Sequence, residues 1–239
     1  MNLDRIAHPL RLAKGSHQPG SGKGCAMNAI SYIGGDTQIT DFPATSARPL
    51  AAFVQLCNDL LAGPDCYLSS ENSFLALELG WQTVGTAVVA DTVVHAWVAE
   101  LLTSPAWGVV QYADNTAVEA IFDIADLHRA LASGAMPSIP AWHSADCAAR
   151  AVSATLAGAG VYAVRAAYQS TALVDTERCG TLDAVTGNAL RAHELATESI
   201  GAARIVEITR HAVRSWRRLA QLDDPGHIEP ASVDNAFDT

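Results

Sequence analysis

The residues best suited to chemistry lie in one glycine-rich segment near the N-terminus. It runs from Gly15 to Asn28 and reads GSHQPGSGKGCAMN. Cys25 directly precedes a run with helical spacing, Lys23 lies two residues before it and His17 lies eight residues before it. A thiol at a helix N-terminus meets unpaired backbone N–H groups and the positive end of the helix dipole, which lower its pKa. The segment therefore makes Cys25 a candidate for activation.

Two interpretations of this segment are open. In the catalytic one, Cys25 is a nucleophile and His17 is its base. The loop between them is long enough to fold back, and Asp41 or Asp36 is placed to orient the histidine. In the structural one, Cys25 is a small helix-start residue packed under the loop, and His17 makes only a local hydrogen bond. Spacing alone does not distinguish the two.

The same loop is a candidate anion site. Glycine-rich amides around Gly22, Lys23 and Gly24 precede a helix, and such amides hold anionic or oxyanion groups. The pattern G-x-x-x-x-G-K-[ST] is not met, because His17 occupies the first glycine position and Gly24 follows Lys23. The segment therefore predicts generic anion binding rather than a nucleoside triphosphatase.

A second candidate anion site lies near the end of the chain. Arg210, Arg214 and Arg217 share one face of a predicted helix. Such a face suits a small anionic ligand, an acidic partner helix or a nucleic-acid backbone. The structural alternative is that arginines near a helix C-terminus complement its dipole and pair with acidic neighbours.

Metal ligation is a further hypothesis. Asp91 with His95, and Glu207 with His211, are i, i+4 pairs that place two ligand types on one helical face. The chain has no CxxC or HxxxH spacing, and it lacks the Glu-x-x-His pairs of dinuclear helical bundles. Locally paired or solvated charge is the ordinary alternative, so no metal or cofactor is predicted.

Composition limits the possible partners. The 239 residues are 49% hydrophobic and 17% charged, which is enough to build a core without disulfides. The 25 acidic and 15 basic residues give a net charge of -10, which disfavours nucleic acid and anionic membrane. Five scattered cysteines and an N-terminus without a hydrophobic run predict a cytoplasmic protein. The most apolar stretch, 84–102, contains charged residues, so no membrane span is expected.

Apolar residues recur at spacings of three and four along most of the chain, which predicts an all-α multi-helix bundle with an N-terminal glycine-rich loop and long C-terminal helices. The predicted helices are 25–33, 46–62, 73–103, 115–133, 144–172 and 182–222. Branched residues leave a strand as the alternative over 84–94. The predicted organisation is a leader at 1–14, one helical domain at 15–222 with a hinge at 136–140, and a disordered tail at 223–239.

Several short segments together resemble a known group of proteins. They are Gly15-Ser16-His17, Gly24-Cys25-Ala26-Met27-Asn28-Ala29, Tyr32-Ile33-Gly34-Gly35, Asp41-Phe42-Pro43-Ala44, Pro49-Leu50-Ala51-Ala52-Phe53 and Asn58-Asp59. The pattern is similar to a family of uncharacterised proteins from actinobacteria and their phages, most specifically over 15–59. The resemblance implies a setting and no activity. Family members carry Glu at the position of Asn28, and a cysteine where this chain has Thr45 and Ser46.

These observations favour a non-catalytic binding or host-interaction protein. Protein–protein contacts or self-association are the expected mode of action, because long helices with this spacing pair readily between chains. The alternative is a thiol-dependent enzyme with Cys25 as nucleophile and His17 as base.

Overall fold

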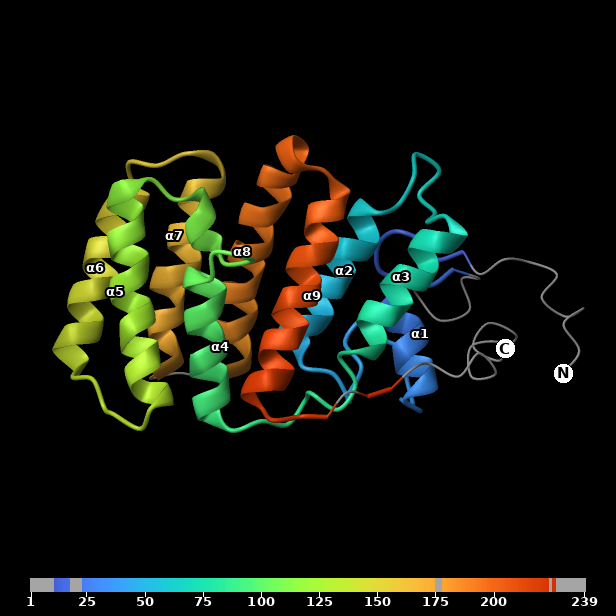
Figure 1. Ribbon diagram of the computed structural model, residues 1–239, viewed down its shortest axis with the longest axis horizontal. Helices are drawn as coiled ribbons and strands as arrows, with labels where there is room; N and C mark the ends of the chain where they lie inside the picture. Colours follow the sequence, from blue (N-terminus) through green and yellow to red (C-terminus); the bar gives the residue numbers. More distant parts are fainter. Residues whose placement is uncertain (1–10, 18–22, 175–177, 224, 227–239) are drawn as a thin grey trace, which may run out of the picture. The chain divides into compact units, whose positions relative to one another are not determined.

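The prediction of an all-α multi-helix bundle is confirmed (Figure 1). The computed structural model describes residues 11–17, 23–174, 178–223 and 225–226. In this part of the chain, β-type pairing is limited to isolated bridges between Ala13 and Tyr67 and between Ser46 and Val84. Most of the predicted leader and tail, 1–10 and 227–239, lies outside the described residues.

The chain divides between Val88 and Val89 into two compact units. The predicted hinge at 136–140 lies instead within the second unit, Val89–Leu222, where it connects two helices that pack together. Ser138 in this connection caps the following helix by accepting a hydrogen bond from the backbone N–H of Ala141. The segment therefore begins a helix rather than separating two domains.

The described residues of the first unit include the helices α1 (Ala26–Ile33), α2 (Arg48–Leu60) and α3 (Ser70–Trp81), which all pack on one another. Their apolar faces form a core with fully buried side chains, among them Leu12, Met27, Ile30, Leu50, Phe53 and Leu68. Asn58 on α2 is also fully buried. Its side chain accepts from the N–H of Ala26 at 3.2 Å and donates to the carbonyl of Ala13 at 3.0 Å. Asn58 thereby joins the N-terminal loop and the start of α1 to α2.

The second unit contains the remaining helices. They are α4 (Asp91–Thr103), η2 (Val109–Tyr112), α5 (Asn115–Ala132), α6 (Ile139–Ser153), α7 (Gly158–Ser170), η3 (Thr171–Val174), α8 (Arg178–Ile200) and α9 (Ala202–Leu219). Helix α4 packs against both α5 and α9. Trp97 anchors the contact with α9. Its indole N–H donates to the carbonyl of Ala212 at 3.0 Å, and its ring packs on Trp216 in a T-shaped pair whose ring centroids are 5.2 Å apart.

The predicted helix 73–103 is two helices, α3 and α4, joined by a loop. Two threonine hydroxyls in this loop bond backbone carbonyls, Thr83 to Gly80 at 2.7 Å and Thr86 to Thr83 at 2.5 Å. Gly85 has a φ of 77°, a left-handed conformation that a helix does not contain. Branched residues continue the apolar spacing through this loop, which is why the break was not visible in the pattern.

The other two long predicted helices are also divided. The range 144–172 becomes α6 and α7, and the range 182–222 becomes α8 and α9. Gly201 is the single residue between α8 and α9. Its φ of 80° lies outside the helical range and ends one helix before the next begins. The predicted helices 25–33, 46–62 and 115–133 correspond to single helices whose ends lie within two residues of those expected.

Candidate functional site

The segment singled out in the sequence places Cys25 at the N-cap of α1, as expected. Cys25 is fully buried. Its sulfur accepts a hydrogen bond from the backbone N–H of Asn28 at 3.4 Å, and its thiol donates to Oδ1 of Asp41 at 3.5 Å. The Asn28 side chain completes a capping box by accepting from the Cys25 N–H at 3.1 Å and donates to the same Asp41 oxygen at 2.9 Å.

Burial of Cys25 opposes the activation that a helix N-terminus can provide. Burial raises the pKa of the thiol to about 12, the N–H of Asn28 opposes this shift, and the nearby carboxylate of Asp41 adds to it. The helix N-terminus therefore does not compensate for the loss of water around the sulfur. Asp41 touches the thiol itself and stabilises its protonated form, instead of orienting a histidine. These contacts favour the structural interpretation of Cys25.

The hydrogen-bond partners of the Cys25 sulfur are Asn28 and Asp41 rather than His17. The Nε2 atom of His17 is buried without a hydrogen-bond partner among the described residues. Lys23 lies over the ring of Tyr67 at 5.5 Å, and the carbonyl of Gly24 accepts from the N–H of Ala13 at 2.9 Å. Gly22 lies outside the described residues. The described part of the loop is therefore tied to neighbouring chain segments.

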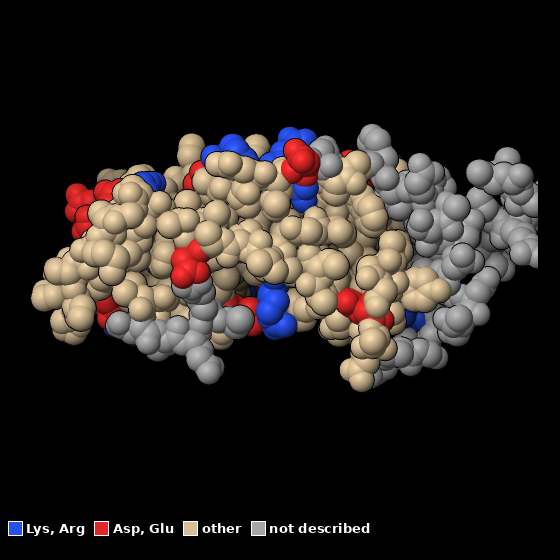
Figure 2. Space-filling view, turned by 90° about the horizontal axis from the view of Figure 1, so that it is seen from below, with Lys and Arg blue, Asp and Glu red and all other residues tan. Residues whose placement is uncertain are grey.

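The arginines of α9 have neighbours of their own. Arg210 pairs with Glu207 on the same helix, Arg218 pairs with Glu100 on α4, and Arg204 donates to the carbonyl of Ala106 at 2.8 Å. Arg214 is exposed and Arg217 is half-buried. Most of the described surface in Figure 2 is uncharged, with acidic and basic side chains in small separate groups. The ion pairs of Arg210 and Arg218 partly neutralise the basic side chains of α9, which weakens the field that would attract a nucleic-acid backbone.

Three histidines of the second unit, His95, His128 and His193, take part in buried hydrogen bonds. His95 and His128 share a hydrogen bond between their Nδ1 atoms at 2.8 Å, and Nε2 of His128 lies 2.8 Å from the hydroxyl of Ser170. Ser170 donates its own proton to the carbonyl of Ala167. The hydroxyl therefore accepts from His128 Nε2–H, and His128 Nδ1 accepts from His95. Within the described residues, no group of three or more His, Cys, Asp or Glu is arranged to hold a metal.

The imidazole rings of His95 and His128, which share this hydrogen-bond chain, are both held neutral. Burial, together with a smaller contribution from the neighbouring His95, lowers the pKa of His128 to about 3. His193 on α8 lies 2.9 Å from the Tyr112 hydroxyl through its Nδ1 atom, and burial likewise lowers its pKa to about 3. A proton added to His128 would displace the hydrogen bond from His95. These histidines are thus structural groups whose protonation opposes folding.

A groove that was not foreseen lies between α4 and α5. It has a volume of about 320 Å³ and is lined by Ala96, Ala99 and Glu100 from α4 and by Arg129, Ala132 and Ser133 from α5. The three alanines leave it shallow and apolar because their side chains end at Cβ. No local spacing signals such a groove, since its two walls come from segments about 30 residues apart.

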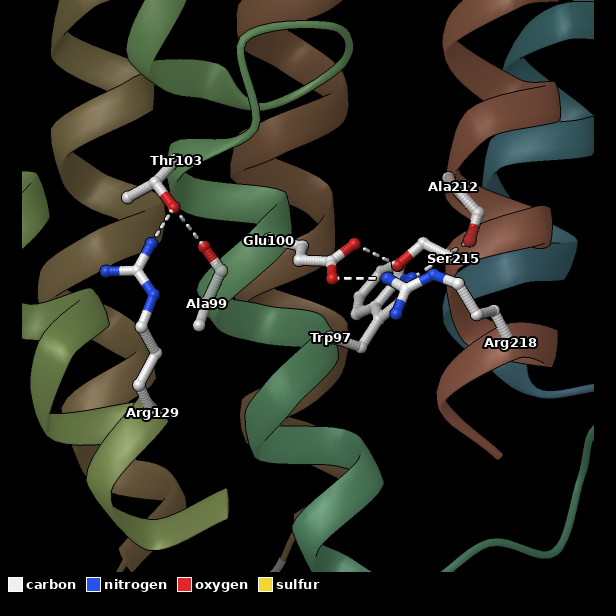
Figure 3. Close-up of polar contacts among 8 residues, drawn as sticks. All are labelled: Trp97, Ala99, Glu100, Thr103, Arg129, Ala212, Ser215 and Arg218. Carbon is white, nitrogen blue, oxygen red and sulfur yellow. Dashed lines mark hydrogen bonds and ion pairs between the residues drawn. The ribbon is translucent and has the colours of Figure 1, made fainter. Parts of the chain in front are cut away.

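The charged residues of the groove are held in place by neighbours (Figure 3). Arg129 reaches from α5 to the hydroxyl of Thr103 on α4 and also pairs with Asp126. Glu100 turns its carboxylate toward α9, where it accepts from the Ser215 hydroxyl at 2.6 Å and pairs with Arg218. Exposed ion pairs contribute little to stability, so the main effect of these contacts is to fix the direction of each charged group.

Comparisons with known proteins leave the function open. No family model, curated protein or solved structure matches this chain. Among the described helices, none combines the length and the apolar character needed to cross a membrane.

Proposed function

We propose that this protein is a non-catalytic binding protein that holds a partner helix in the α4/α5 groove. The observation that carries the proposal is the alanine-floored groove of about 320 Å³, whose polar residues already have fixed partners. An amphipathic helix laid along such a groove inserts one or two apolar side chains and leaves its polar face in water.

Exposed apolar side chains extend the groove along α5. Phe122, 39% exposed, lies seven residues before Arg129 on the same helical face, and the Arg129 guanidinium lies 5.8 Å from its ring. Beyond the end of α5, Met136 is 83% exposed. Large apolar side chains left in water beside a groove are typical of a surface that a partner covers. We therefore assign the partner side chains an apolar character.

The charges of the groove favour a protein partner over a polyanion. Arg129 is paired with Asp126, and Glu100 is paired with Arg218, so each cation is matched by a carboxylate. Because these groups are held in place before binding, less side-chain entropy is lost when a partner arrives. The chain's net charge of -10 further opposes binding of nucleic acid.

Site-specific photo-crosslinking tests the proposal. A benzophenone side chain at Ala132, inside the groove, is exposed to an actinobacterial lysate, the source suggested by the resemblance over 15–59. The same group at Ala203, an exposed alanine of α9 outside the groove, is the matched control. We expect one protein to be captured from Ala132 alone, through an apolar residue of a helix.

The purified partner then provides the quantitative test. Ala132→Phe fills the groove and should weaken binding at least tenfold, whereas Ala203→Phe should leave the Kd unchanged. Equal affinity of wild type and Ala132→Phe would refute the proposal, as would capture from both positions alike.

A further inference from the structure

A cysteine and a histidine lie side by side on the surface of α6. His143 and Cys147 are one helical turn apart, both are exposed, and Nε2 of His143 lies 3.7 Å from Sγ of Cys147. Helix α6 packs against α5 and α7 and is the outermost helix of the second unit in Figure 1. The pair therefore faces solvent on an uncovered side of the bundle.

The separation of the two atoms matches a shared metal ion. In a tetrahedral zinc site the Zn–S bond is about 2.3 Å and the Zn–N bond about 2.0–2.1 Å, which places the two ligand atoms about 3.6 Å apart. The 3.7 Å between His143 and Cys147 fits this spacing without any change of backbone. Asp146, the nearest acid in sequence, is bound to Arg150 at 2.7 Å and does not complete the set.

The pair supplies half of a tetrahedral site. No third His, Cys, Asp or Glu of the described chain joins it. Cys147 lies one residue from the midpoint of α6, which runs from Ile139 to Ser153. Of the exposed residues around it, Ser144, Ala148 and Ala151 are small, and Arg150 is drawn aside by Asp146 and by the Tyr168 ring on α7, so a second α6 could approach closely. A two-fold axis through the middle of the helix brings two such pairs together.

We infer that His143 and Cys147 form a half-site for Zn²⁺ or a similar thiophilic divalent cation, completed by the same residues of a second copy of this chain. Two cysteines and two histidines then surround one ion, a common structural zinc set. Each thiol loses its proton to solvent when the metal binds, so binding weakens as the pH falls. This site is independent of the α4/α5 groove.

Metal titration of the reduced, metal-free protein tests the inference. With Cd²⁺ we expect an ultraviolet thiolate-to-metal charge-transfer band that saturates at one ion per two chains. With Zn²⁺, sedimentation should show conversion of monomer to dimer. Cys147→Ser and His143→Gln should remove both signals, whereas Cys66→Ser, the matched control at another exposed cysteine, should retain them.

The second copy is tested separately from the metal ligands. Ala148→Trp keeps both ligands but blocks the approach of another helix, so it should prevent the zinc-dependent dimer. A charge-transfer band that persists in Cys147→Ser would overturn the site. Saturation at one ion per chain without a dimer would overturn its completion by a second copy.

Discussion

Acidification should unfold this protein through its buried histidines. The pKa of His128 and the pKa of His193 are both lowered to about 3, mainly by burial and to a smaller extent by His95 and Arg204 respectively. In the unfolded chain a histidine titrates near 6.5, so between these values the unfolded state binds more protons than the folded state. The free energy of unfolding therefore falls as the pH falls from about 6.5 toward 3.

The size of the effect follows from the number of protons. One extra proton in the unfolded state changes the free energy of unfolding by about 1.4 kcal/mol per pH unit, so two buried histidines give about 3 kcal/mol per unit. Burial also lowers the pKa of His95, which acts in the same direction. Since small domains are stable by about 5–15 kcal/mol, a fall of about two pH units removes a large share of the total.

Urea unfolding, followed by tryptophan fluorescence between pH 7.5 and 4.5, measures this slope before most carboxylates titrate. His128→Gln keeps a donor for Ser170 and an acceptor for His95 but removes the titrating group, so the slope should fall by about one proton. His193→Gln gives an independent measure if the first variant folds poorly. Ala203→Gln, which introduces the same side chain at an exposed position of α9, is the control and should keep the wild-type slope. A flat profile between pH 6.5 and 5, or an unchanged slope in both buried variants, would refute the reasoning.

Three further outcomes are expected. Alkylation of the native protein, read by peptide mass spectrometry, should label the exposed Cys66 and Cys147 and leave the buried Cys25 and Cys57 protected. Fast labelling of Cys25 would contradict its assignment as a helix cap. In the same urea assay, Gly108→Ala should destabilise the protein by about 1–3 kcal/mol, because the new Cβ would lie 2.5 Å from the backbone nitrogen of Ser104. Gly187→Ala is the contrasting variant, because its Cβ would lie in open space within α8, and it should stabilise the protein by up to about 1 kcal/mol. Asn58→Ala should cost about 2 kcal/mol or more, because it leaves Ala26 N–H and the Ala13 carbonyl buried without their partner, and a loss below 0.5 kcal/mol would argue against that bridge.

Local patterns predicted the helices well and their interruptions poorly. The spacing of apolar residues located α1, α2 and α5, because each has one buried face and clear end signals. The loop after α3 was missed because its breaks depend on hydroxyl groups that bond nearby carbonyls, as Thr83 and Thr86 do. Such bonds compete with helix only in a particular tertiary setting, so apolar spacing does not reveal them.

The chemistry of single residues depended even more on tertiary contacts. Cys25 was correctly placed at a helix start, but its pKa is determined by burial and by Asp41, which lies 16 residues away. The groove likewise needs two helices to meet. The pair of His143 and Cys147, by contrast, is an i, i+4 spacing that a search for mixed ligand pairs could have found.

The bond between Asn28 and Asp41 has a consequence for how this protein can evolve. The amide of Asn28 donates to the carboxylate that also receives the Cys25 thiol, so position 28 must offer a donor as long as position 41 is acidic. A glutamate at 28 would bring two carboxylates together beside a buried sulfur, and one of them would have to take up a proton or a cation. A mutation at either position therefore changes which residues the other can accept. A relative that carries glutamate at position 28 and keeps the aspartate at 41 should therefore hold an extra proton or cation between the two carboxylates.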